Sequence, residues 1–152
     1  DLHSFPTRRS SDLWQSRMLN WGRYVVAQNV GGYKFDEKTN TFPIFINYNK
    51  GEDVVESQKY EDKFESRSSL IGVSKSTEDA KSKNMQRVAD SEKNGTVIHL
   101  FVRKNKDDRN ALEFYYLGTM QFDRFVKTDK PCKIRYRLMS EIRADLYEYL
   151  VN

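Results

Sequence analysis

Short runs in which apolar and polar residues alternate recur along the chain, and they predict strands more often than helices. One such run occupies residues 42–48, and a second, residues 133–138, alternates three apolar with three basic positions. This two-residue period is typical of a strand with one covered face. Apolar, β-branched or aromatic residues predict further short strands at residues 24–27, 33–35, 70–73, 96–102 and 112–117.

Helical signals are fewer and weaker. Ser76 or Thr77 is expected to cap a helix that runs to about residue 91 and is polar on most of its surface. Residues 144–151 predict a short terminal helix, and residues 18–21 are expected to close another one. Together these elements predict an α+β fold, built on a mostly antiparallel curved sheet or open β-barrel with one polar surface helix and small terminal helices.

Composition places the chain among single folded domains. It has 152 residues, 13% of them aromatic, which is enough to bury a sizeable core. The single cysteine, Cys132, permits no internal disulfide, and no apolar run approaches the ~20 residues of a membrane span. We therefore expect a cytoplasmic protein with no membrane partner. The formal net charge of +4 permits a polyanionic partner without requiring one.

The first thirteen residues differ in character from the rest. Residues 5–13 read FPTRRSSDL, which resembles the translation of a common sequencing adapter. We interpret residues 1–13 as an artefactual leader, the alternative being a genuine basic arm that contacts DNA. Residues 14–152 are then one domain, a truncated fragment of a larger protein.

Residue types needed for catalysis are sparse. His99 lies within an apolar run, and a packed histidine explains it better than a catalytic one. One usable histidine and one cysteine are too few for a zinc site, and the sequence has no phosphate-binding glycine motif. The carboxylate pairs Glu61–Asp62 and Asp107–Asp108 are of a kind that arises by chance. We predict no catalytic residues, no metal and no cofactor, and no enzyme activity for the domain alone.

Two short segments could contact nucleic acid. Residues 60–64 read YEDKF, and the rings of Tyr60 and Phe64 could sandwich a base while Asp62 accepts a hydrogen bond from an exocyclic amine. The alternative is a solvated loop held by the two rings in the core. Residues 74–76, Ser-Lys-Ser, could contact phosphate before a helix, or they could simply cap that helix.

Two basic patches could contact phosphates as well. The polar positions of residues 133–138 are Lys133, Arg135 and Arg137, and Arg103 with Lys104 follows the apolar run at residues 96–102. Arg and Lys neutralise DNA phosphates without reading sequence. The alternative for both patches is an ordinary solvated surface.

Five segments in this order carry a resemblance: residues 29–50 (NVGGYKFDEKTNTFPIFINYNK), 60–64 (YEDKF), 70–76 (LIGVSKS), 98–104 (IHLFVRK) and 114–118 (FYYLG). The chain resembles an uncharacterised domain family found at the C-terminus of bacterial superfamily II helicase-like proteins. Some of these proteins are type IV, modified-cytosine-dependent restriction enzymes.

The resemblance implies a target-recognition module that reads modified cytosine by base flipping with an SRA-like fold. On that basis Tyr60 and Phe64 are ring contacts, Asp62 is the acceptor, and Ser74, Lys75 and Ser76 clamp the backbone. Many relatives carry a bulky aromatic residue where Gly72 stands, so its loss here puts the width of the pocket and the identity of the base in doubt. The cavity that would hold the flipped base is also expected to be lined by Tyr33, Asn47 and Tyr48.

We therefore expect a domain that binds DNA, in duplex form, for helicase or nuclease modules of the same parent chain. The alternative is a structural domain that couples such modules through protein–protein contacts. Salt-dependent binding of DNA would favour the first, and a salt-insensitive complex with the other modules the second.

Overall fold

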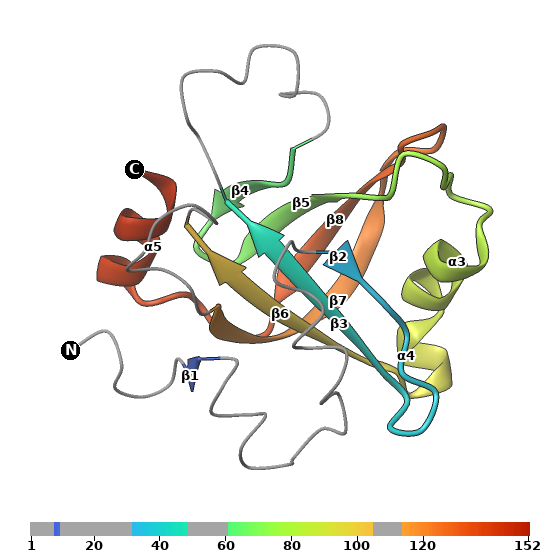
Figure 1. The fold of residues 1–152 in the computed structure, drawn as a ribbon, viewed down its shortest axis with the longest axis horizontal. Coiled ribbons are helices and arrows are strands. Elements are labelled where there is room, and N and C mark those ends of the chain that lie inside the picture. The colour runs from blue at the N-terminus through green and yellow to red at the C-terminus, as the bar shows by residue number, and fades with distance from the viewer. Residues whose placement is uncertain (1–7, 10–31, 49–60, 105–113) are drawn as a thin grey trace.

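The computed structural model describes residues 8–9, 32–48, 61–104 and 114–152 (Figure 1). The strand predicted at residues 24–27 and the helix predicted at residues 18–21 lie outside these ranges, as does the rest of the leader apart from residues 8–9. The described strands are β1 (Arg8–Arg9), β2 (Gly32–Tyr33), β3 (Thr41–Asn47), β4 (Lys63–Ser66), β5 (Ser69–Val73), β6 (Val97–Arg103), β7 (Tyr115–Lys127) and β8 (Lys133–Leu138). The described helices are α3 (Lys83–Ala89), α4 (Ser91–Asn94) and α5 (Ala144–Val151).

These strands form one sheet in the order β2-β3-β6-β7-β8-β5-β4, with β1 also paired to β7. Every pair is antiparallel except β3 with β6, which is parallel. A parallel pair needs a long crossover connection, and here β4, β5, α3 and α4 lie between β3 and β6 in the chain. The predicted α+β class and mostly antiparallel sheet are confirmed.

Alternating apolar side chains of the sheet face one main core. Phe42 of β3, Leu100 of β6 and Leu70 of β5 are fully buried there. Helices α3 and α5, at opposite ends of the sheet in Figure 1, add Met85 and Leu146 to the same core. Both helices are short, and packing of their apolar faces supplies most of their stability.

The sheet curls so that its two ends approach each other. The hydroxyl of Tyr48, the residue after β3, accepts a hydrogen bond from the backbone N–H of Phe64 on β4 at 3.0 Å. The hydroxyl of Tyr33 on β2 accepts one from the N–H of Lys75 at 2.8 Å. Side chains thus bridge a gap that strand pairing leaves open among the described residues.

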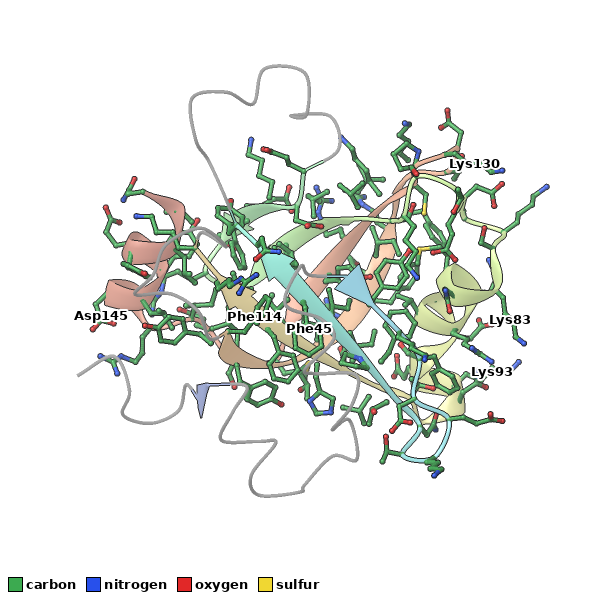
Figure 2. The ribbon with its side chains drawn as sticks, viewed as in Figure 1. Phe45, Lys83, Lys93, Phe114, Lys130 and Asp145 are labelled. Atoms are coloured by element: carbon green, nitrogen blue, oxygen red, sulfur yellow. The ribbon has the colours of Figure 1, made fainter. Side chains whose placement is uncertain are left out.

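The opposite face of β3 and β6 carries a second aromatic cluster. The rings of Phe45 and Phe101 stack with centroids 4.5 Å apart, and Phe114 meets Phe45 edge-on at 5.2 Å. Figure 2 shows the labelled rings of Phe45 and Phe114 close together on this face. Both faces of β3 and β6 are therefore covered, which explains why β6 reads as a nearly continuous apolar run.

Three elements differ from the sequence prediction. The polar helix begins at Lys83 and not near residue 77. Before it, the buried Ala80 donates its N–H to the carbonyl of Thr128 at 2.9 Å, and a tertiary bond of this kind competes with a helical turn. Residues 63–66 form β4, part of which falls in the segment 60–64 whose alternative interpretation was a solvated loop, and β7 extends well beyond residue 117.

Candidate nucleic-acid interface

The predicted basic stripe on β8 is part of a wider cationic surface. Pairing with β7 sets Lys127 opposite Lys133 and Arg124 opposite Arg135. Directly paired residues of antiparallel strands point to the same side of a sheet, so these side chains share the side away from the core. We call this surface the cationic face and define it by Arg124, Lys127, Lys133, Arg135 and Arg137.

Sequence reasoning missed the contribution of β7 for a specific reason. The register between β7 and β8 shifts twice, between Phe122 and Arg124 and between Phe125 and Lys127. Each bulge inserts an extra residue and interrupts the two-residue period. Arg124 and Lys127 are three positions apart, so the sequence alone does not place them on one side of a strand.

Two cations of this face already form hydrogen bonds with neighbouring side chains. Arg135 donates from Nε and Nη2 to both carboxylate oxygens of Glu65, at 2.7 and 2.8 Å. This bidentate contact lowers the pKa of Glu65 to about 2, with the Ser69 hydroxyl as a second donor. Arg137 donates to Oε1 of Gln121 at 3.3 Å. Within the described residues Arg124, Lys127 and Lys133 form no ion pair.

A small cavity lies where the resemblance implied a base pocket, and it brings together Asp62, Tyr33 and Ser74 from the predicted set. It encloses about 10 Å³, roughly the space of one water molecule. Asp62 Oδ1 accepts the backbone N–H of Val73 at 2.8 Å, so the carboxylate supports β5. A nucleobase does not fit this cavity in the structure as it stands.

Several predicted contact residues are used by the fold instead. Phe64 is buried against Tyr48, with ring centroids 5.1 Å apart, and neither ring is exposed enough to stack on a base. Arg103 is 4% exposed, because its guanidinium lies over the Phe114 ring at 4.5 Å and its Nε donates to Asn47. In the structure, Phe64, Tyr48 and Arg103 are buried in the two faces of the sheet, and Asn47 accepts a hydrogen bond from Arg103. Tyr60 lies outside the described residues.

The residues of the predicted phosphate clamp, 74–76, lie in the turn that follows β5. The Ser74 hydroxyl accepts the N–H of Cys132 at 2.9 Å and lies within donor distance of the carbonyls of Lys75 and Glu78. It therefore ties this turn to the start of β8, and no helix begins there. Lys75 and Ser76 are exposed, and the Lys75 ammonium lies over the Tyr33 ring at 4.9 Å. The ammonium of Lys104 lies 5.0 Å from the Tyr149 ring centroid.

Gly72 is constrained by the ring of Tyr136 on β8. A Cβ atom added at residue 72 would lie 2.7 Å from Cε2 of Tyr136 and 3.8 Å from Oδ1 of Asp62. Tyr136 is buried, and burial together with the nearby Asp62 charge raises its hydroxyl pKa. A larger residue at position 72 therefore requires a different placement of this ring, so glycine and Tyr136 depend on each other.

Two negative findings bear on other kinds of site. Among the described residues no group of three or more His, Cys, Asp and Glu side chains is arranged to hold a metal ion. The helices in those same ranges are too short or too polar to cross a membrane.

Fold and surface together define a small α+β domain whose curved sheet carries cations on its outer side. The chain belongs to the family described as Domain of unknown function (DUF3427), whose model matches residues 14–150. A comparison with curated proteins finds no match.

Proposed function

We propose that this domain binds duplex DNA, with the cationic face contacting phosphates. The observation that carries the proposal is the register of β7 with β8, which joins Arg124 and Lys127 to the three cations of β8. Same-face residues of a strand are about 6.7 Å apart, so three of them extend over several phosphates, because each DNA strand carries one phosphate per about 3.4 Å of helix axis. Because Arg and Lys side chains are long and flexible, they can reach these phosphates even where the strand and the DNA backbone are not exactly aligned.

The proposed role is target recognition for helicase or nuclease modules of a parent protein, as the sequence resemblance implies. Phosphate contacts set the position of a protein on DNA and carry no sequence information. Recognition of modified cytosine beside Asp62 would require that cavity to enlarge from the room of one water molecule. Phosphate binding is therefore the part of the function that the geometry supports best.

Binding of a short, labelled duplex at several salt concentrations tests the proposal by fluorescence anisotropy. The logarithm of the affinity is expected to fall linearly with the logarithm of salt concentration. Lys133→Glu and Arg137→Glu should each weaken binding and reduce the slope by about 0.9 for each phosphate that the variant no longer neutralises.

Lys38→Glu is the matched control, because Lys38 is exposed in the turn between β2 and β3 and the substitution changes the net charge equally. It should leave both the affinity and the slope nearly unchanged. An equal loss with Lys38→Glu, or no salt-dependent binding by the unmodified domain, would overturn the proposal. A salt-insensitive complex with a helicase or nuclease module, with no binding of DNA, would favour the structural role instead.

A further inference from the structure

A second, larger cavity lies between helices α3–α4 and the strands β6 and β7. It has a volume of about 320 Å³, which is within the range of roughly 300–1,000 Å³ typical of small-ligand pockets. Both polar and apolar residues line it, and none of the predicted contact residues belongs to it. Its lining is Ala89, Ser91, Glu92, Thr96, Val97, Thr119, Met120, Gln121, Phe122 and Met139.

This lining includes a buried hydroxyl, unpaired in the described part of the chain, and two exposed apolar side chains. Ser91 is only 5% exposed, yet its hydroxyl forms no hydrogen bond with any described residue. Buried polar groups are ordinarily paired, so this hydroxyl is available to a bound molecule. Val97 and Met139 are 41% and 53% exposed, and they are two of the three large apolar residues exposed in the described ranges.

The cavity is joined to the cationic face through Gln121. This residue lines the cavity and pairs with Arg137 across the β7–β8 ladder. Its Oε1 accepts a hydrogen bond from Arg137 at 3.3 Å, which leaves its amide N–H groups as donors. An anionic group held by Arg137 would therefore lie next to the cavity.

We propose that this cavity receives one unpaired nucleobase while its phosphate lies on Arg137. The Phe122 ring and the methionines offer apolar surface to a flat base, Ser91 and Gln121 can donate or accept at its edge, and the Glu92 carboxylate can accept from an exocyclic amine. A nucleotide, which joins a flat, hydrogen-bonding base to an anionic phosphate, therefore matches both the cavity and the adjacent Arg137. The inference rests on the proposed function and assigns the base to a site distinct from the Asp62 cavity.

A pair of duplexes tests it, one fully paired and one of the same sequence with a single bulged nucleotide. The unmodified domain should bind the bulged duplex about tenfold more tightly, since stacking of one base on an aromatic side chain contributes on that scale. The two affinities are measured by anisotropy at one salt concentration, and the salt slope is measured for both duplexes.

Two substitutions should narrow the cavity: Ala89→Leu at the end of α3 and Ser91→Phe at the start of α4. Both should abolish the preference for the bulged duplex and leave the affinity for the paired duplex unchanged. Ala144→Leu is the matched control, because Ala144 is exposed at the start of α5 and is not part of the cavity lining. Circular dichroism checks folding, and if Ser91→Phe does not fold, Ala89→Leu decides.

The outcomes separate the two proposals. Equal, salt-dependent affinity of the unmodified domain for both duplexes overturns the cavity assignment and leaves phosphate binding in place. A bulge preference that persists in the folded cavity variants overturns the assignment as well. Failure to bind either duplex overturns both proposals.

Discussion

The hydroxyl of Tyr33 accepts the backbone N–H of Lys75 at 2.8 Å, although the two residues are 42 positions apart in the chain. The same hydroxyl donates to the carboxylate of Glu78. Burial and this contact with Glu78 raise the pKa of Tyr33, so the hydroxyl keeps its proton throughout the neutral range. One side chain of β2 therefore holds the turn that follows β5, and it bridges the two ends of the curled sheet.

Tyr33→Phe should lower the free energy of unfolding by about 1–3 kcal/mol, because it leaves a partly buried N–H without its acceptor. Hydrogen exchange at the Lys75 amide should accelerate more than exchange in β7 and β8. Urea denaturation provides the stability measurement. Tyr147→Phe is the control, since the Tyr147 hydroxyl forms no hydrogen bond with the described residues. Equal losses for the two variants would contradict the bridging role.

Gly72→Ala should destabilise the domain by about 1–3 kcal/mol, the usual cost of overpacking. The added Cβ would lie 2.7 Å from Cε2 of the buried Tyr136 ring, and a rigid ring cannot yield as a flexible side chain does. The cost should shrink when Tyr136 is replaced by Leu, which a double-mutant cycle measures. Additive losses in that cycle would show that the two residues do not depend on each other.

Stability should decrease in mildly acidic solution because of His99. Burial lowers its pKa from 6.5 to about 4, and its Nδ1 lies 2.8 Å from the Tyr116 hydroxyl. Between these values the unfolded chain binds a proton that the folded chain does not, so the stabilisation is complete above pH 6.5 and falls as the pH drops toward 4. The loss over this window is on the order of 3 kcal/mol.

His99→Gln, which can still bond to Tyr116, should remove most of this additional pH dependence. Urea denaturation of both proteins across the same pH range measures the difference. Parallel stability–pH curves would mean that another group is responsible.

Glu65→Gln should strengthen DNA binding. Glu65 holds Arg135 through two hydrogen bonds, and loss of its charge releases the guanidinium for a phosphate. The expected gain is roughly two- to fivefold at low salt, comparable to one surface ion pair. Glu37→Gln, in the exposed turn between β2 and β3, controls for the change in net charge. An equal gain in the control would argue against a direct role for Arg135.

Local sequence patterns located several elements well, because a covered face repeats every two residues in a strand. Residues 133–138 were predicted as a strand with its cations on one side, and β8 has these bounds with Ile134, Tyr136 and Leu138 buried. The terminal helix was likewise predicted at residues 144–151. Turn chemistry was less informative, since the Ser74 and Ser82 hydroxyls bond to backbone groups of the turn and of Cys132, and α3 begins without a side-chain cap.

The sequence placed candidate site residues correctly on the surface only where a local pattern determines their exposure, as on β8. Phe64 and Arg103 were plausible contact residues, yet Tyr48 and Phe114 cover them from strands or segments distant in the chain. No pattern around residue 64 or 103 records which distant side chains will pack there. The lining of the larger cavity could not be predicted from a local pattern either, because its residues come from α3, α4, β6, β7 and Met139.

By itself, the sequence determined which residues form strands and which side of β8 carries charge, since both depend on period and side-chain chemistry within a few residues. Tertiary structure alone decided that β7 adds Arg124 and Lys127 to that side, through two register shifts. It also decided that both faces of β3 and β6 are covered. A bulge interrupts the two-residue period, so pairing with β8 decides which side of the sheet a β7 residue takes after it. The covering of β3 and β6 depends on contacts between residues far apart in the chain, such as Phe45 with Phe101 and Phe114.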